Sequence, residues 1–277
     1  MKDYFIKTAA KGDPFQNAFI FDCHGHLGSC TDFYIPGTSP ENLLKVLDRV
    51  GINVAAVSSF GGVQPFGNDI VGQTVSSFPD RFVGYARVNA NYPITIKKEL
   101  ERCFDRFGFK GIKIHPYCDQ VFPDDPRYEP VWKFAHEHSI PVLIHTWNNL
   151  RGSDLLLRFC APSLFEKIAR DYPEARIILG HSGGEYDGIL EAIKLAKAMP
   201  NVYLDTASSR LYPGIVKMMV NEAGAEKVLY GSDIPFLSPV PQIGKIIYAD
   251  LEEHEKRKIL GLNAAKLFNI TNTATNI

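Results

Sequence analysis

The sequence lacks several features that would assign it to a class at once. No apolar run approaches the roughly 20 residues that a membrane helix needs, so no membrane partner is expected. Basic residues are not in excess, because 30 Lys and Arg stand against 31 Asp and Glu. A nucleic-acid-binding surface calls for net positive charge, so no nucleic-acid partner is expected either. The first 19 residues lack the long apolar segment of a secretory signal, which predicts a cytoplasmic protein.

Cysteine is too sparse for a disulfide framework. The chain has five cysteines at wide spacing and no CxxC pair. Without a secretion signal, this odd number predicts free thiols and excludes a cysteine-based zinc knuckle. Cys23 is the one cysteine beside residues suspected of chemistry, His24 and His26. On a strand its side chain would point away from theirs, so a packing role is expected for it.

Short apolar runs alternate with longer amphipathic segments along most of the chain. The predicted strands are 18–24, 53–60, 82–89, 108–115, 140–147, 175–181, 201–208 and 227–233. Several are almost continuously apolar, as parallel strands covered on both faces are. Eight strand–helix units in about 250 residues predict a single-domain (β/α)8 TIM barrel. The alternative is an open doubly wound sheet, which usually has a Gly-rich phosphate loop after its first strand, and "CHGHLG" is not one. We expect an N-terminal extension at 1–18 and the barrel at 19–277.

Polar residues follow these apolar runs at the strand ends, where TIM barrels carry their chemistry. His24 and His26 end the first predicted strand, and the fifth, sixth and eighth end in His145, His181 and Asp233. In an H-x-H pair on a strand both side chains project from the same face. Zinc and similar divalent ions take three or four nitrogen or oxygen ligands. The sequence therefore predicts one divalent ion held by His24, His26, His145 and Asp233.

Four segments resemble the ordered signatures of a known family. "DCHGHLG", "LIHTWN", "ILGHSGG" and "YGSDIPF" are similar to those of the amidohydrolase superfamily. The resemblance is strongest to its amidohydrolase-2 branch, which contains the aminocarboxymuconate-semialdehyde decarboxylase-like enzymes. It covers residues 19–270 and implies a barrel with one catalytic divalent metal, usually zinc. It also suggests a homodimer. Members of this branch often begin almost at the first strand, so the first 18 residues depart from the pattern and suggest a short hairpin or an oligomer contact.

The resemblance also implies roles for individual residues. His24, His26 and His145 would be metal ligands, and Asp233 would be a ligand or a general base beside the metal. His181 would orient the reactive water or polarise the substrate. A divalent metal makes hydroxide available from water at neutral pH, and a general base can take up the water's proton. We therefore expect a metal-dependent hydrolase acting on the carbonyl of a small-molecule amide, lactone or imine.

Decarboxylation of a small unsaturated or aromatic carboxylate is the main alternative, because it would use the same ligands. Candidate cations for holding the departing carboxylate are Lys113, Arg151 and Arg210. A non-enzymatic barrel with a structural metal is a further alternative, but structural zinc sites are closed and typically use cysteines. The substrate's identity stays open, although aromatic and polar residues near the strand ends suit a small cyclic or carboxylated molecule: Phe60, Tyr117, Trp147, Asn148, Tyr186 and Phe236.

Two further roles are left open by the residues. In two-metal members of the superfamily a carboxylated lysine bridges two ions, and Lys113 with His181 could supply a second ion here. A single ion is favoured, because "GFKGIKIHP" also resembles the branch in which this lysine is not a bridge. Asp205, at the end of the seventh predicted strand, could orient a metal ligand or cap a loop.

Overall fold

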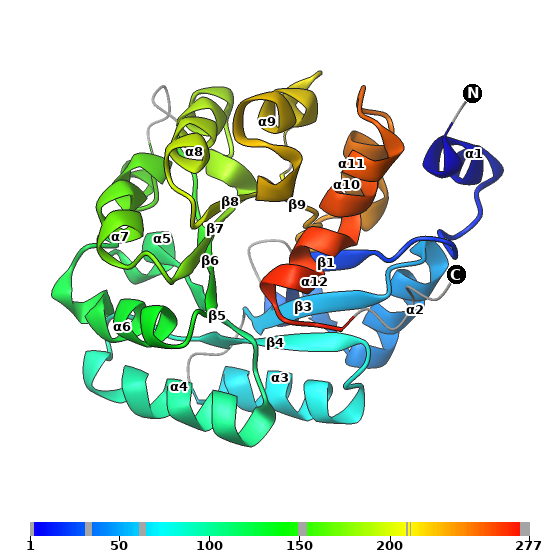
Figure 1. Ribbon diagram of the computed structural model, residues 1–277. Coiled ribbons are helices and arrows are strands. Elements are labelled where there is room, and N and C mark those ends of the chain that lie inside the picture. Colours follow the sequence, from blue (N-terminus) through cyan, green and yellow to red (C-terminus); the bar gives the residue numbers. More distant parts are fainter. Residues whose placement is uncertain are drawn as a thin grey trace.

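The fold is a ring of parallel strands surrounded by helices, as Figure 1 shows for this computed structural model. The structure describes residues 3–30, 35–60, 65–148, 154–208, 210 and 212–271. Neighbouring strands pair in the order β2-β1-β3-β4-β5-β6-β7-β8-β9, and β2 (Ile35–Thr38) runs antiparallel to β1. The eight parallel strands are β1 (Phe21–Cys30), β3 (Val54–Ser59), β4 (Phe82–Arg87), β5 (Gly111–Ile114), β6 (Pro141–His145), β7 (Arg176–Gly180), β8 (Val202–Asp205) and β9 (Val228–Leu229).

The ring closes between β1 and the segment after β9. The Cys23 N–H donates to the Tyr230 carbonyl oxygen at 2.9 Å, and the Asp233 N–H donates to the His24 carbonyl oxygen at 2.8 Å. Gly25 forms a parallel bridge with Ile234. The predicted single-domain TIM barrel is therefore confirmed, with the eight parallel strands in the predicted order. The closure also brings "DCHGH" and "YGSD", more than 200 residues apart in sequence, into contact.

The helices pack around the outside of this ring because their apolar faces cover the strands. They include α2 (Pro40–Val50), α3 (Phe66–Ser77), α4 (Pro93–Phe107), α6 (Glu129–Glu137), α7 (Glu166–Asp171), α8 (Tyr186–Ala198), α9 (Ile215–Ala223) and α10 (Pro239–Ile247). Helix α2 begins and ends at residues that favour helix termini. Ser39 Oγ accepts from the Asn42 N–H at 3.3 Å, and Gly51 adopts a left-handed φ of 87°. A short helix, α5 (Pro116–Asp119), follows β5 directly.

The C-terminal helical segment is not continuous. It divides into α11 (Glu253–Arg257), a π-helical turn at Lys258–Leu262 and α12 (Asn263–Leu267). Gly261 lies in this turn, and a Cβ there would lie 2.2 Å from the Phe19 carbonyl oxygen. Because the glycine has no side chain, this part of the helix can approach the start of the barrel closely.

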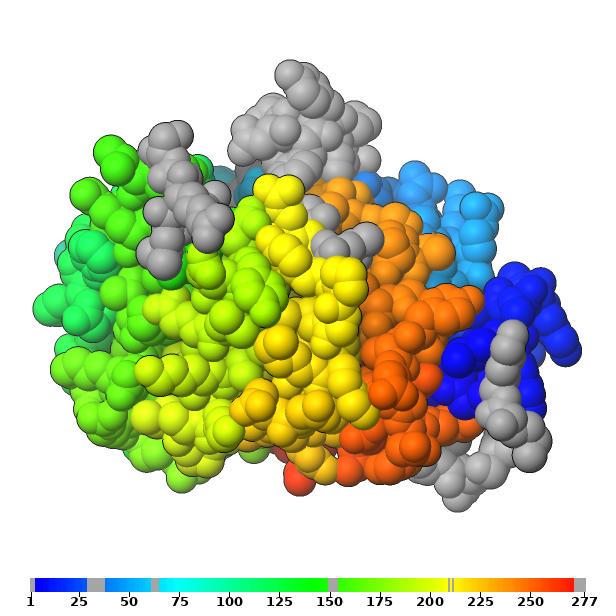
Figure 2. Space-filling model, turned by 90° about the horizontal axis from the view of Figure 1, so that it is seen from above, coloured from blue at the N-terminus to red at the C-terminus, as the bar shows by residue number. Residues whose placement is uncertain are grey.

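The N-terminal residues form a helix and not a hairpin, while the other expectation for them, an oligomer contact, stays a prediction. Helix α1 (Tyr4–Lys11) packs beside the C-terminal helices, and Figures 1 and 2 both show it, in blue, against orange segments. Phe5 is fully buried, Asp3 forms an ion pair with Lys256, and the Tyr4 N–H donates to a Glu253 carboxylate oxygen at 3.0 Å. A boundary between residues 18 and 19 therefore remains a prediction. Within the described ranges, no helix combines the length and apolarity needed to span a bilayer.

Candidate active site

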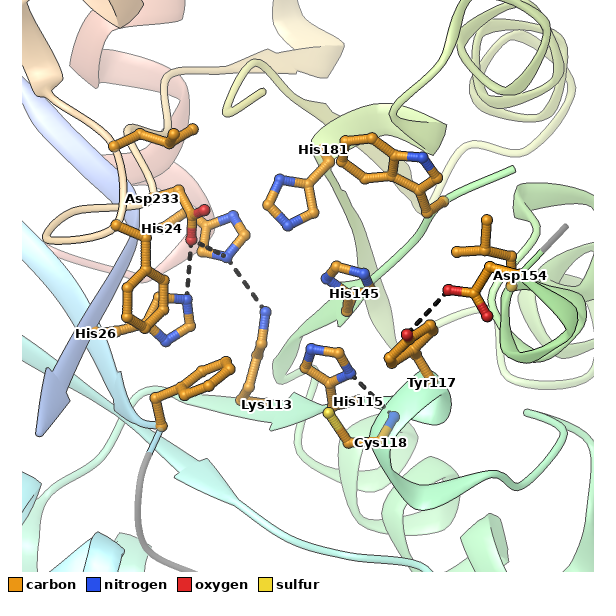
Figure 3. Close-up of a pocket in the computed structure, with 15 residues that line it drawn as sticks. His24, His26, Lys113, His115, Tyr117, Cys118, His145, Asp154, His181 and Asp233 are labelled. Carbon is orange, nitrogen blue, oxygen red and sulfur yellow. Dashed lines mark hydrogen bonds and ion pairs between the residues drawn. The ribbon is translucent and has the colours of Figure 1, made fainter. Parts of the chain in front are cut away.

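A cavity of about 410 Å³ opens at the carboxyl ends of the parallel strands. The sequence-predicted His24, His26, His145, His181 and Asp233 all line it, and Figure 3 shows their side chains turned toward a common space. All five are buried or nearly so. The barrel therefore brings together in one pocket every residue that the sequence selected for metal binding and catalysis.

His24 is held at the centre of this site by Asp205. Its Nδ1 lies 2.6 Å from Asp205 Oδ2, and both side chains are fully buried. The carboxylate also accepts the backbone N–H of His181 at 3.0 Å and that of Ala207 at 2.9 Å. An imidazole beside a carboxylate carries its proton on the nearer nitrogen, so the Nε2 lone pair of His24 faces the pocket. Asp205 therefore has both of its expected contacts: it orients His24, and it accepts the N–H of Ala207 in the loop after β8.

A glycine makes this pair sterically feasible. A Cβ on Gly231 would lie 2.1 Å from Asp205 Oδ1 and 2.8 Å from His24 Cβ. Any side chain at position 231 would therefore displace the buried His24–Asp205 pair. This steric requirement gives a physical reason for the glycine in "YGSD".

His26 and Asp233 complete a compact group of possible ligands with His24. Asp233 Oδ1 lies 3.1 Å from His26 Nε2 and 3.6 Å from His24 Nε2. One ligand atom from each of the three residues lies within 4.8 Å of the other two. Ser58 Oγ lies 3.1 Å from the other ring nitrogen of His26, Nδ1. Two imidazoles, each with a hydrogen-bonding partner at its other ring nitrogen, and one carboxylate oxygen suit a divalent transition metal.

A second compact group, formed by His24, His181 and Asp205, is a hydrogen-bond network and a poorer metal site. Both Asp205 oxygens already accept hydrogen bonds from His24, His181 and Ala207. His181 is held in turn by its Nδ1, which lies 3.0 Å from the Ala207 carbonyl oxygen. A carbonyl only accepts, so this nitrogen carries the proton and the His181 Nε2 lone pair is free for the pocket.

His145 lies in the pocket but outside both compact groups. Its ring stacks on that of His115 with centroids 4.1 Å apart, and its centroid lies 4.8 Å from that of His181. Figure 3 places it between these two histidines. Its role as a fourth ligand therefore remains a prediction. His115 also lines the cavity, and its Nδ1 accepts the Cys118 N–H at 3.3 Å.

The backbone is strained where two of these side chains are presented. His181 has a φ of 62° and Asp233 a φ of 63°, both in the left-handed region that few residues other than glycine adopt. Such strain persists where the surrounding structure holds it in place, and it is concentrated at functional sites. Here the Asp233 N–H is held by the His24 carbonyl oxygen, and the His181 N–H by Asp205.

Burial sets the protonation states of the histidines. It holds the pKa of His24 and His145 well below the usual range and lowers the pKa of His181 to about 4. These rings are therefore neutral at pH 7 and can offer lone pairs. Burial would raise the pKa of Asp233, but the hydrogen bond from His26 and nearby positive charges outweigh it. Asp233 is therefore a carboxylate.

Lys113 brings a positive charge into the same pocket. It belongs to β5, its residue is 1% exposed, and burial lowers the pKa of its ammonium group to about 8. Its Nζ lies 3.2 Å from His24 Nε2, as the dashed line in Figure 3 shows. Of the other two cations that the sequence proposed, Arg210 is exposed and pairs with Glu185 at 2.9 Å. Arg151 lies outside the described residues.

Aromatic side chains form much of the pocket wall. Phe60, Tyr117, Trp147 and Phe236, all selected from the sequence, line the cavity. The Phe236 ring stacks on His26 with centroids 4.9 Å apart, and Tyr117 OH donates to Asp154 at 2.9 Å. Asn148 and Tyr186 do not line it. Asn148 Nδ2 donates to Glu191, and Tyr186 is 42% exposed on α8.

Sequence reasoning missed one supporting residue and left a second without a definite role. Ser58, beside His26, is a polar residue within the apolar run "NVAAVSSF", and that interruption is the signal that could have identified it. Asp205 was recognised at its strand end, but its partner could not be known. Strand spacing does not show that β8 lies close enough to β1 for Asp205 to reach His24.

Comparisons with known proteins agree with this architecture. A model of the amidohydrolase family matches residues 21–270. The chain is similar to the gamma-resorcylate decarboxylase of Rhodococcus jostii (strain RHA1), with 24% identity over 251 residues, covering 73% of this chain and 75% of that protein. It is also similar to the 2-amino-3-carboxymuconate-6-semialdehyde decarboxylase of Dictyostelium discoideum, with 25% identity over 237 residues, covering 73% of this chain and 65% of that protein.

A solved structure shares the fold. The dihydroxybenzoic acid decarboxylase from Polaromonas sp. JS666, with bound manganese and the inhibitor 2-nitroresorcinol, superimposes with a TM-score of 0.72. The two sequences are 18% identical, and the match covers 94% of this chain and 100% of that chain. At this identity the likeness establishes the fold and not the reaction.

The curated relatives correct the expected reaction. The sequence predicted a metal-dependent hydrolase, whereas the relatives from Rhodococcus jostii and Dictyostelium discoideum are both decarboxylases. The prediction was wrong because the same strand-end histidines and aspartate can serve carbonyl hydrolysis or loss of CO₂, so the motifs alone do not separate the two. The alternative of a carboxy-lyase is the one that the comparisons support. The family itself is not in question, since its model matches 21–270 and the structure has its barrel: the chain belongs to the amidohydrolase superfamily, in its amidohydrolase-2 branch.

Proposed function

We propose that this protein is a metal-dependent decarboxylase of a small aromatic or unsaturated carboxylate. The observation that carries the proposal is the buried group His24, His26 and Asp233, which faces an aromatic-walled cavity of about 410 Å³. A cavity of this size suits a molecule with a single ring. The two curated relatives, which act on carboxylated substrates according to their names, support the same reaction class.

His24, His26 and Asp233 would hold one divalent ion, with His145 as the predicted fourth ligand. Their nitrogen and oxygen donors fit such an ion, because neutral imidazole and carboxylate are common ligands of zinc and manganese. When bound, a divalent ion polarises a substrate oxygen and stabilises negative charge that develops on it. Zinc was expected from the family, while the solved relative from Polaromonas contains manganese, so both metals belong in the test.

The aromatic wall would orient the substrate and exclude water. Phe60 and Phe236 contact each other edge to face at a centroid separation of 4.7 Å, and Phe236 lies on the ring of His26. The centroids of the Trp147 and His181 rings lie 5.7 Å apart. A planar substrate can pack against these faces with its carboxylate toward the histidines. Such packing keeps water away from the carbon that loses CO₂.

The remaining chemistry is a proton exchange. The bond between the substrate carbon and its carboxylate breaks, CO₂ leaves, and the electron pair stays on the carbon, which then takes up one proton. Asp233 would relay that proton: as a carboxylate it can take one from a substrate hydroxyl or from solvent, to which its residue is 8% exposed, and pass it to the carbon. His181 is held by Ala207 with its Nε2 lone pair toward the pocket, so it can accept a hydrogen bond from a substrate hydroxyl.

CO₂ release tests the proposal directly. Protein loaded with Mn²⁺ or Zn²⁺ is assayed against a panel of hydroxybenzoates and unsaturated carboxylates, and we expect metal-dependent release from at least one of them. Asp233→Asn should abolish this release without unfolding the protein, since Asn tolerates a positive φ. Asp105→Asn, a change on the exposed face of α4, is the matched control and should retain activity. Absence of CO₂ release across the panel with either metal would contradict the proposal.

The number of ions and subunits can be measured in the same preparations. One metal equivalent per chain is expected, and two would support the bridging alternative through Lys113 and His181. The homodimer suggested by the family is a prediction that sedimentation or light scattering can check.

A further inference from the structure

Lys113 is a buried cation whose hydrogen-bonding partner is an imidazole nitrogen, that of His24. No carboxylate in the described part of the chain lies within ion-pair distance of its Nζ. Two other cations at the same end of the barrel are paired with oxygen. Arg87 contacts Asp119 at 2.8 Å, and Lys245 Nζ donates to the carbonyl oxygens of Thr206 at 3.1 Å and Ser208 at 2.8 Å. An ammonium group removed from water without a strong acceptor is costly. Lys113 therefore needs an explanation that Arg87 and Lys245 do not.

The acceptor that Lys113 has is the atom that a metal would use. Its Nζ lies 3.2 Å from His24 Nε2. Because His24 Nδ1 is committed to Asp205, Nε2 has the single available lone pair of the ring. That lone pair can accept a proton of Lys113 or coordinate a divalent ion, but it cannot do both. Lys113 thus competes with a metal for the ligand atom at the centre of the proposed site.

We propose that Lys113 is displaced from His24 when the metal binds and then donates to the carboxylate of the substrate. This inference rests on the proposed function and assigns a substrate-positioning role to one residue of the pocket. In this role Lys113 would make the pocket bind anionic molecules more tightly than neutral molecules of the same shape.

Charge and space favour an external anion as the second acceptor. Asp233 offsets only one of the two positive charges of a divalent ion and would be engaged by that ion. The displaced ammonium group stays inside the pocket because Lys113 extends from β5 into the cavity, where its residue is 1% exposed. A carboxylate held between the ion and Lys113 would satisfy both charges, and charge-assisted hydrogen bonds of this kind are strong.

Opposite effects on two affinities test this role. Chelator-treated Lys113→Met protein should bind Mn²⁺ about 10- to 100-fold more tightly than the wild type, because a competing charge-assisted hydrogen bond is gone. In the Mn²⁺-loaded form, the same variant should bind benzoate about 10- to 100-fold more weakly. Binding of benzamide, which has the same shape without the charge, should not change. Titration calorimetry measures all three affinities, and Lys113→Arg should restore the preference for benzoate over benzamide.

Lys245→Met is the matched control. It removes another lysine, partly buried at the same end of the barrel, but Lys245 does not line the cavity. This variant should lose thermal stability and keep both the Mn²⁺ and the benzoate affinities of the wild type. Lys113→Gln provides a second neutral variant should the methionine prevent folding.

The competing explanations predict different results. Weaker Mn²⁺ binding in Lys113→Met, or a fall from two equivalents to one, would make Lys113 a part of the metal site and overturn the proposal. An equal loss of benzoate and benzamide binding would reduce its role to packing. Equal affinity of the wild type for both probes would also refute it. None of these readouts depends on turnover, so the binding role can stand or fall independently of CO₂ release.

Discussion

His24 Nδ1 and Asp205 Oδ2 lie 2.6 Å apart at the buried base of the pocket, and this contact joins β1 to the end of β8. It fixes which nitrogen of His24 faces the cavity. Burial raises the pKa of Asp205 to about 7, while the backbone N–H groups of Ala207 and His181 oppose that rise. The carboxylate is therefore held by three donors that all require it to accept.

Asp205→Asn should weaken metal binding by about 10- to 100-fold, the usual effect of removing a residue that orients a ligand. Asp205 accepts from His24, His181 and Ala207, and an asparagine has only one side-chain oxygen. Its NH₂ group would face at least one of these N–H donors, and the repulsion would shift the His24 ring. Competition with a chelator of known affinity measures the change. An unaltered metal affinity would show that His24 is oriented by packing alone.

His181→Gln should lower kcat by about 10²- to 10⁴-fold and leave the metal affinity within a few fold, because His181 is predicted to act on the substrate. Steady-state kinetics and metal titration separate the two effects. His136→Gln, on the outer helix α6, is the control and should change neither. Loss of a metal equivalent in His181→Gln would instead identify this residue as a ligand of a second ion.

Glu99→Gln should destabilise the protein at pH 7 by about 1–3 kcal/mol. The Glu99 carboxylate accepts from Asn68 at 2.7 Å and from Arg102 at 2.7 Å. Burial would raise the pKa of Glu99, but these hydrogen bonds hold it below the ordinary value of 4.5. A lowered pKa in the folded state contributes stability that is present above pH 4.5 and is lost as the pH falls below it.

Urea unfolding at two pH values measures this dependence. The free energies of unfolding of wild type and Glu99→Gln should differ most near pH 7 and converge below pH 4.5. Glu101→Gln is the control on the same helix, because its contact with Lys97 is exposed and long at 3.8 Å. A difference that does not depend on pH would mean that the charge of Glu99 contributes nothing.

Phe5→Ala should cost about 3–5 kcal/mol of unfolding free energy, the usual range for removing a buried phenylalanine. Phe5 is fully buried, and its ring contacts that of Phe15 at a centroid distance of 5.8 Å. Ile94→Ala, at a residue 96% exposed, should cost less than about 0.5 kcal/mol. Thermal and chemical unfolding compare the two. A loss below about 1 kcal/mol for Phe5→Ala would mean that α1 unfolds separately from the barrel.

The sequence predicted the barrel because its signals are local. Apolar runs act within a few residues, as do Ser39 and Pro40 at the start of α2 and Gly51 at its end, and the structure has the eight strands in the predicted order. The N-terminal helix was not predicted because it is held by residues distant in sequence: Asp3 and Tyr4 contact Lys256 and Glu253. The π-helical turn was missed for the same kind of reason, since Gly261 approaches the backbone of Phe19.

The features of the site also divide into those that local sequence signals predict and those that depend on tertiary contacts. The sequence by itself determined the strand-end positions of His24, His26, His145, His181 and Asp233, because a period of two and a strand terminus suffice to aim side chains at the barrel mouth. Only the tertiary structure decided that Asp205 orients His24 and that Lys113 occupies its Nε2. These contacts depend on the closure of the ring, which sets the distance between β1, β5 and β8 and cannot be read from any one strand.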